Sequence, residues 1–225
     1  MIKLLIYDLD GTLIDSRRDI ANAVNWALKE LGLKEIQMEK IISFVGRGVT
    51  DLMRNVLTET LGGEGSAGAT HASPLLRRSI KLYRGRYAEH LLDETQLFPS
   101  VRAVLEHFKG RKQGVITNKP AGFSQEILLR LGVEAYFFRM IGGDQEFAKK
   151  PSPEPVFEMM KSAQVSSDET VLIGDSTIDI ETARNAKVKV IAAAYGFENK
   201  AGLENLRPDF MVNDFSELIQ CPLLG

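Results

Sequence analysis

The chain opens with IKLLIYDLDGT, residues 2–12, in which a continuous apolar run over 4–7 leads directly to Asp8 and Asp10. The run predicts a buried strand, and Gly11 is a typical place for a strand to end. Side chains two apart on a strand point to the same side, so Asp8 and Asp10 should project together from its carboxyl end, where open α/β sheets bind their ligands. Because two like charges this close repel, a nearby cation would relieve the cost. An acidic turn that only ends the strand is the alternative.

Short apolar runs alternate with helical spacing through the second half of the chain. Strands are expected at 114–118, 137–141, 170–175, 188–194 and 210–212, with helices at 101–108, 123–131, 153–163, 178–186 and from Ser216 onward. This alternation predicts an α/β fold whose Rossmann-like parallel sheet carries helices on both faces.

The segment that follows the first strand has a different pattern. Helices are expected near 20–31, 38–45, 49–57 and 74–91, and no strand pattern occurs among them. A glycine-rich stretch at 62–68 has the composition of a flexible loop. The sequence therefore predicts an all-helical block inserted after the first strand of the sheet.

Composition excludes several functional classes. The formal net charge of −2 argues against a nucleic acid partner, which usually requires a basic face. No apolar stretch approaches the roughly 20 residues of a membrane span, and Asp8 and Asp10 interrupt the first apolar run too early for a signal peptide. The single cysteine, Cys221, cannot form an intrachain disulfide, which fits a reducing compartment. We therefore expect a cytoplasmic protein with no membrane partner.

Polar groups follow three further strands or loops of the predicted sheet. They are Thr117-Asn118, Lys150-Pro151 and the run Gly174-Asp175-Ser176-Thr177-Ile178-Asp179. Parallel strands place their carboxyl ends on one edge, so these groups can converge there with the first two aspartates. Together they offer carboxylates for a hard cation, a hydroxyl and an amide for phosphoryl oxygens, and a cation for negative charge.

This constellation resembles the haloacid dehalogenase superfamily of phosphatases over nearly the whole chain. The family's four motifs are matched in order by Asp8-Leu9-Asp10-Gly11-Thr12, by Thr117, by Lys150 before a proline-rich turn, and by Gly174-Asp175 with Asp179. The resemblance implies a catalytic core formed by 1–14 and 93–225, with residues 15–92 as the family's small helical cap. It also implies a small phosphorylated substrate and a monomer or homodimer.

The resemblance assigns roles to the aspartates. Asp8 is implied as the nucleophile that forms an aspartyl-phosphate, and Asp10 as the acid that protonates the leaving oxygen and later deprotonates water. Mg²⁺ is the implied cofactor, held by the Asp8 carboxylate, the Asp10 backbone carbonyl and the Asp175 carboxylate. Asp179 either binds the metal through water or only orients the other ligands.

The remaining motif residues are implied to bind the phosphoryl group or to support the aspartates. Thr117 and the Asn118 backbone would hydrogen-bond the phosphoryl oxygens, and Lys150 would neutralise developing charge, with Lys149 as the alternative lysine. Two other residues are implied beside the aspartates: Thr12 holds Asp10 or only forms the turn, and Ser176 contacts metal-bound water or caps a helix.

The cap carries the features expected to select the substrate. Phe44-Val45-Gly46-Arg47-Gly48 resembles the cap loop of phosphoglycolate phosphatases and their near relatives, which makes 2-phosphoglycolate the expected substrate. Arg47 can grip a carboxylate or second phosphate in a bidentate pair, or it can be a solvated surface charge. The alternatives are another small phosphate ester or pyrophosphate, a sugar phosphomutase, or a binding module without enzymatic activity.

Overall fold

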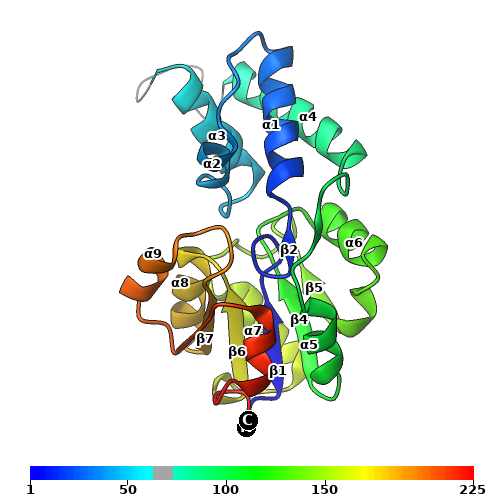
Figure 1. The fold of residues 1–225 in the computed structure, drawn as a ribbon, viewed down its shortest axis with the longest axis vertical. Helices are drawn as coiled ribbons and strands as arrows, with labels where there is room; N and C mark the ends of the chain where they lie inside the picture. The colour runs from blue at the N-terminus through cyan, green and yellow to red at the C-terminus, as the bar shows by residue number, and fades with distance from the viewer. Residues whose placement is uncertain (63–72) are drawn as a thin grey trace. The chain divides into compact units, whose positions relative to one another are not determined.

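The computed structural model describes residues 1–62 and 73–225, and its contacts divide the chain into two units (Figure 1). The first unit contains Met1–Asp15 and Gln96–Gly225, and the second contains Ser16–Thr95. Most of the glycine-rich stretch expected to form a flexible loop, 63–68, lies outside the described residues. Among the described helices, none combines the length and apolar character that crossing a membrane requires.

Six parallel strands form the sheet of the first unit, in the order β5-β4-β1-β6-β7-β8. Their bounds are Leu4–Tyr7 for β1, Lys112–Ile116 for β4, Arg139–Ile141 for β5, Thr170–Gly174 for β6, Lys189–Ala193 for β7 and Phe210–Val212 for β8. The predicted parallel α/β sheet is therefore confirmed. The first strand of the chain lies in the middle of the sheet, which is why its side chains are buried on both faces.

The register of β1 sets the position of the residues that follow it. Tyr7 is paired with Val115 of β4 and with Ile173 of β6, so the three strands end almost level. The backbone N–H of Asp8 donates to the Ile173 carbonyl at 2.9 Å, which carries the pairing one residue further. The chain segments after β1, β4 and β6 consequently leave the sheet at one edge.

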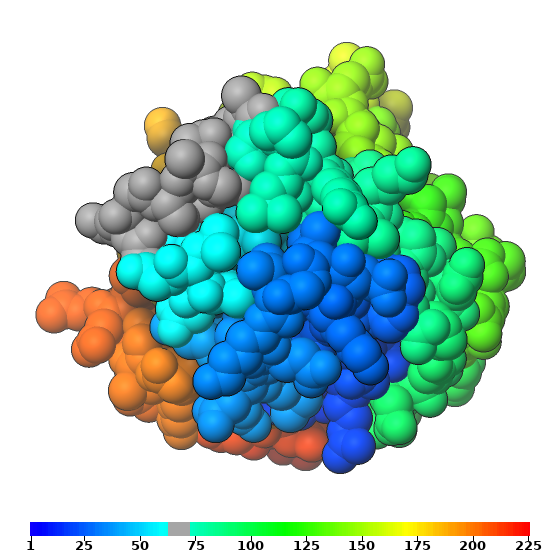
Figure 2. Space-filling view, turned by 90° about the horizontal axis from the view of Figure 1, so that it is seen from above, coloured from blue at the N-terminus to red at the C-terminus, as the bar shows by residue number. Residues whose placement is uncertain are grey.

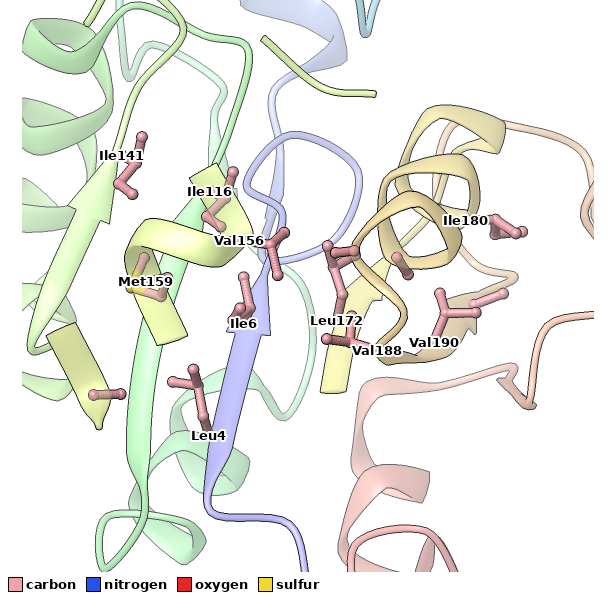
Figure 3. Close-up of a cluster of buried hydrophobic side chains, with 14 of the residues drawn as sticks. Leu4, Ile6, Ile116, Ile141, Val156, Met159, Leu172, Ile180, Val188 and Val190 are labelled. Carbon is pink, nitrogen blue, oxygen red and sulfur yellow. The ribbon is translucent and has the colours of Figure 1, made fainter. Parts of the chain in front are cut away.

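Alternate residues of β1 face two different helical layers. Leu4 and Ile6 join an apolar cluster with Val156 and Met159 of α7 (Glu154–Ala163), and α8 (Thr177–Ala186) contributes to the same cluster (Figure 3). On the opposite face the Tyr7 ring lies 5.9 Å from that of Phe215 in η4 (Phe215–Gln220), which packs on α5 (Val101–His107). Helices therefore cover both faces of the sheet, as predicted.

Several short elements of the first unit were not predicted or differ from prediction. The elements that were not predicted are α9 (Lys200–Asn205), η2 (Glu134–Tyr136), η3 (Ser167–Glu169), and the paired strands β2 (Ile14–Asp15) and β3 (Gln96–Leu97). The helix expected at 123–131 is present as α6 (Ala121–Arg130). The helix expected from Ser216 is the 3₁₀ helix η4, too short to display helical periodicity.

The second unit contains four described helices. They are α1 (Arg17–Glu30), α2 (Met38–Ile42), α3 (Val49–Thr60) and α4 (Pro74–Glu89). The predicted helical insert after the first strand is confirmed for the described residues of this unit, which contain no strand. The first and last of these helices pack together and lie side by side (Figure 1, Figure 2). Gly32, with φ +69°, follows the end of α1 as expected from the sequence.

The chain leaves and re-enters the first unit through the short β2–β3 ladder. Ile14 is paired with Leu97 and Asp15 with Gln96. Just inside the second unit, the Asp19 carboxylate of α1 accepts hydrogen bonds from the backbone N–H groups of Glu94 and Thr95 and from the Thr95 hydroxyl, at 2.7–3.1 Å. Asp19 is only 2% exposed, so these donors replace the water that its charge would otherwise need.

We predict that Asp19→Ala lowers the free energy of unfolding of the second unit by about 2–4 kcal/mol, because buried N–H groups left without an acceptor each cost about 1–3 kcal/mol. The measurement is chemical denaturation followed by the fluorescence of Trp26, the only tryptophan, which lies in α1. Glu30→Ala, an exposed acidic residue of the same helix, is the control and should change stability by less than about 0.5 kcal/mol. Equal effects of the two substitutions would show that the hydrogen bonds accepted by Asp19 do not stabilise the second unit.

Candidate active site

Three carboxylates meet at the edge of the sheet where β1 and β6 end. Oxygen atoms of Asp8, Asp175 and Asp179 all lie within 4.8 Å of one another. Asp8 directly follows β1, Asp175 directly follows β6, and Asp179 lies in the first turn of α8. Strand ends that are far apart in sequence therefore bring these three predicted site residues together.

Burial makes this cluster unfavourable in its fully charged form. Desolvation raises the pKa of Asp8 to about 7, although Lys150 lowers it and the Asp179 charge adds to the rise. Desolvation also raises the pKa of Asp175 well above its ordinary value, and the charges of Asp8 and Asp179 act in the same direction. The site therefore favours additional positive charge.

Lys150 provides part of that positive charge. Its Nζ lies 2.8 Å from Asp8 Oδ1 and 2.6 Å from Asp179 Oδ1, and its side chain is 3% exposed. Burial alone would lower the pKa of Lys150, but Asp179 and Asp8 outweigh it and raise the pKa above its ordinary value. Lys149 is exposed, so the structure brings Lys150, and not its neighbour, to the carboxylates.

The Asn118 side chain fixes the backbone from which Lys150 extends. Its amide donates to the Lys150 carbonyl and its oxygen accepts from the Lys150 N–H, each at 2.9 Å. The sequence predicts only a contact of the Asn118 backbone with phosphate, so this side-chain contact is an additional finding. Thr117, 4% exposed, lies beside it, and its hydroxyl accepts from the backbone N–H of Lys119 at 3.2 Å.

Asp175 is held on two sides by residues from other loops. The Thr12 hydroxyl donates to its Oδ1 at 2.9 Å, and the backbone N–H of Phe197 donates to its Oδ2 at 2.7 Å. A Cβ added to Gly11 or Gly196 would lie 2.1 Å from an Asp175 side-chain atom, so both positions require glycine. Thr12 thus contacts Asp175 in this structure, whereas the resemblance placed it beside Asp10.

Asp179 combines a helix-capping role with its contact to Lys150. Its carboxylate accepts from the backbone N–H and hydroxyl of Ser176, while its own N–H donates to the Ser176 hydroxyl at 3.3 Å. This reciprocal arrangement is a capping box at the start of α8. Of the two roles considered for Ser176, the structure shows the helix cap.

Asp10 has a partner that the sequence motifs do not predict. Lys119 Nζ lies 2.7 Å from Asp10 Oδ1, and the two side chains are 6% and 11% exposed. Lys119 directly follows Thr117-Asn118 at the end of β4, the strand beside β1, so its place at the polar edge was the available signal. Residue type alone does not indicate this position, because lysines are mostly exposed.

A loop after β7 also supports the site without having been predicted. The Tyr195 hydroxyl donates to the Thr12 carbonyl at 2.8 Å, two residues before the Phe197 N–H that holds Asp175.

Arg47 belongs to the second unit, where it is exposed between Gly46 and Gly48. Both glycines have positive φ, and Gly48 is the N-cap of α3.

The carboxylate cluster has the chemistry required for a hard divalent cation. Ionised carboxylates and backbone carbonyls are the ligands that Mg²⁺ prefers, and the Asp8, Asp175 and Asp179 oxygens are close enough to share one ion. The raised pKa values of Asp8 and Asp175 fit the same interpretation, because a cation would favour their charged forms. The residues present therefore fit such an ion.

Comparisons with known proteins agree with this geometry. The family model for haloacid dehalogenase-like hydrolases matches residues 5–193. The chain is 33% identical over 221 residues to the phosphoglycolate phosphatase of Vibrio parahaemolyticus, covering 97% of this chain and 95% of that protein. It is 34% identical over 218 residues to the phosphoglycolate phosphatase of Nitrosospira multiformis, covering 96% and 93%. A crystal structure from Haemophilus somnus, described as a predicted phosphoglycolate phosphatase, has a TM-score of 0.89 at 27% identity, with 97% of both chains covered.

We predict that Mg²⁺ raises the melting temperature of the protein more at about pH 8 than at about pH 6. The folded-state pKa of Asp8, about 7, lies above that of the unfolded chain. Its protonation therefore stabilises the cation-free fold at low pH, and this contribution is lost as the pH rises through about 7. A bound cation can then replace the proton. The measurement is thermal unfolding of chelator-treated protein with and without Mg²⁺ at both pH values.

Asp175→Asn is the matched control for this experiment, because it removes one charged ligand with little change in shape. The variant should lose most of the Mg²⁺-dependent rise in melting temperature at about pH 8. An equal rise at both pH values, or an undiminished rise in the variant, would contradict a cation site at these carboxylates.

Proposed function

The chain belongs to the haloacid dehalogenase-like hydrolase family, and we propose that this phosphomonoester hydrolase works through an aspartyl-phosphate on Asp8, requires Mg²⁺ and acts on 2-phosphoglycolate. The observation that carries the proposal is the position of Lys150, whose Nζ bridges the Asp8 and Asp179 carboxylates at the edge of the sheet. A partly exposed carboxylate paired with a buried cation is suited to reaction with an anionic ester.

In the first half of the proposed reaction, an Asp8 oxygen attacks phosphorus and the bond from phosphorus to the leaving oxygen breaks. Asp10 gives its proton to that leaving oxygen. In the second half, water attacks the phosphorus of the aspartyl-phosphate, Asp10 takes a proton from the water, and the bond from Asp8 to phosphorus breaks. Acid–base help of this kind contributes about 10²- to 10⁴-fold in rate.

The other site residues are proposed to hold the phosphoryl group and the cofactor. Asp8 and Asp175, with the Asp10 backbone carbonyl, would hold Mg²⁺, which when bound offsets the charge of the phosphate oxygens. The Thr117 hydroxyl would donate to the phosphoryl oxygens, together with the Asn118 backbone N–H. Lys150 would neutralise charge in the transition state while Asp179 keeps its ammonium in place.

The choice of 2-phosphoglycolate rests on the relatives' names and on one cap residue. Two phosphoglycolate phosphatases are similar over nearly the full chain, and Arg47 lies exposed between two glycines of the second unit. Its guanidinium could bind the substrate carboxylate in a bidentate pair. A panel of phosphate esters that includes 2-phosphoglycolate, other small esters, pyrophosphate and a sugar phosphate, read as released phosphate, tests this choice.

We predict that Asp8→Asn abolishes phosphate release while the protein stays folded. The amide is nearly the same shape as the carboxylate but is not a comparable nucleophile, and the change reduces repulsion within the acidic cluster. Phosphate release and thermal unfolding are measured on the same sample, with Asp93→Asn at an exposed position as the control. Residual activity above roughly a few per cent of wild type would reject Asp8 as the nucleophile.

We predict that Arg47→Ala lowers kcat/KM for 2-phosphoglycolate by about ten- to a hundredfold and leaves a neutral aryl phosphate nearly unaffected. The magnitude follows from a charge-assisted hydrogen bond worth about 1.5–3 kcal/mol. Arg78→Ala, at an exposed position of α4, is the control. Equal losses on both substrates would assign Arg47 to another role, and no loss on either would remove the carboxylate contact from the proposal.

A further inference from the structure

The partly buried ion pair between Lys119 and Asp10 has no role in the proposed reaction steps. Lys119 Nζ and Asp10 Oδ1 are 2.7 Å apart, and the lysine side chain is 6% exposed. Removing a lysine ammonium from water is unfavourable unless a partner replaces the lost hydration. Asp10 is such a partner, so the contact differs from a surface ion pair, whose partners exchange freely with water.

The backbone that carries Lys119 is held firmly. Its N–H donates to the Thr117 hydroxyl at 3.2 Å, and its carbonyl accepts from the Gly143 N–H at 2.9 Å. A Cβ added to Gly143 would lie 2.3 Å from the Asn118 carbonyl oxygen, so the two loops pack too closely for a larger residue. The lysine therefore extends toward Asp10 from a fixed point.

The structure gives the two aspartates of the first motif different lysines. Lys150 contacts Asp8, whereas Lys119 contacts Asp10. The proposed nucleophile and the proposed acid–base group are therefore oriented by separate cations from separate loops, so one carboxylate can be disturbed without the other.

The chemistry of an ammonium group determines which Asp10 oxygen can exchange a proton. Lysine has three donors and no acceptor, so the oxygen that it contacts must accept a hydrogen bond. Asp10 Oδ1 can do so both as part of a carboxylate and as the carbonyl oxygen of a protonated carboxyl group. The proton is then carried by Oδ2.

We propose that Lys119 is a positioning residue for acid–base catalysis: it holds Oδ1 of Asp10 and thereby directs Oδ2 to the oxygen that gains or loses a proton. The inference rests on the proposed function, because it concerns the group that exchanges protons there. It adds a requirement for a particular orientation of Asp10, supplied by a residue outside the four motifs.

The test compares two substrates that differ in their need for an acid. A nitrophenolate leaves without being protonated, whereas an alkoxide needs a proton as its bond to phosphorus breaks. The value of kcat/KM for each substrate reports the steps up to the first phosphoryl transfer. Lys119→Met should therefore lower kcat/KM for an alkyl phosphate at least about tenfold more than for p-nitrophenyl phosphate.

Two further variants make the outcome decisive. Asp10→Asn should show the same preference for the nitrophenyl substrate, and adding Lys119→Met to it should change kcat/KM less than about threefold, because both changes remove one function. Lys149→Met, which changes an exposed lysine on another loop, is the control for loss of charge.

Equal losses on both substrates with Lys119→Met, or no loss on either, would overturn the proposal, since Lys119 would then serve phosphate binding, folding or neither. Losses that are fully additive with those of Asp10→Asn would overturn it as well. If Asp10→Asn itself fails to discriminate between the substrates, the acid role of Asp10 in the proposed function is wrong and the role of Lys119 fails with it. Inactivity of the wild-type protein toward every phosphate ester would instead reject the proposed function as a whole.

Discussion

Repulsion among carboxylates at the edge of a buried sheet is the constraint on which the rest of the first unit depends. The oxygens of three carboxylates, Asp8, Asp175 and Asp179, lie within 4.8 Å of one another. This spacing is possible only because positive charges and hydrogen-bond donors from several loops offset the repulsion between them. Lys150 bridges two of them, and the third is held by a hydroxyl and a backbone N–H. Those donors lie on loops whose starting points are fixed by the level ends of parallel strands. The register of the sheet therefore determines where the groups that stabilise the carboxylates lie.

The sequence predicts those parts of the fold that depend on periodic burial. The strand β1 is apolar throughout, and β4 and β6 contain the apolar runs 115–116 and 171–173, because both faces of the sheet are covered. The helices of the second unit show the spacing of one buried side. Elements of only two to six residues are too short to repeat such a pattern, even where single side chains such as Ile14, Leu203 and Phe215 are buried. The two-residue strands β2 and β3, the short helix α9 and the 3₁₀ geometry of η4 were missed or misassigned for this reason.

The sequence likewise predicts some residues of the candidate site and not others. The strand-end aspartates Asp8 and Asp175, and Lys150 in the loop before α7, could be identified because their chemistry and their topological position coincide. Supporting contacts are harder to predict, because the same residue type serves many purposes. The reciprocal hydrogen bonds of Asn118 with Lys150, and the pairing of Lys119 with Asp10, depend on side-chain directions that only three-dimensional packing fixes.

The β2–β3 ladder has a consequence for how such a chain can change over evolutionary time. Asp15 and Gln96 are neighbours across the ladder, so the chain of the first unit is already closed at the point where the helical segment departs. An insertion with adjacent ends imposes almost the same closure entropy whatever its length, because that entropy grows only slowly with the number of residues. Recombination at this single point can lengthen, shorten or exchange the inserted module while the strands that carry the carboxylates keep their register. The architecture thus separates change in the inserted helices from change in the strands that carry the carboxylates.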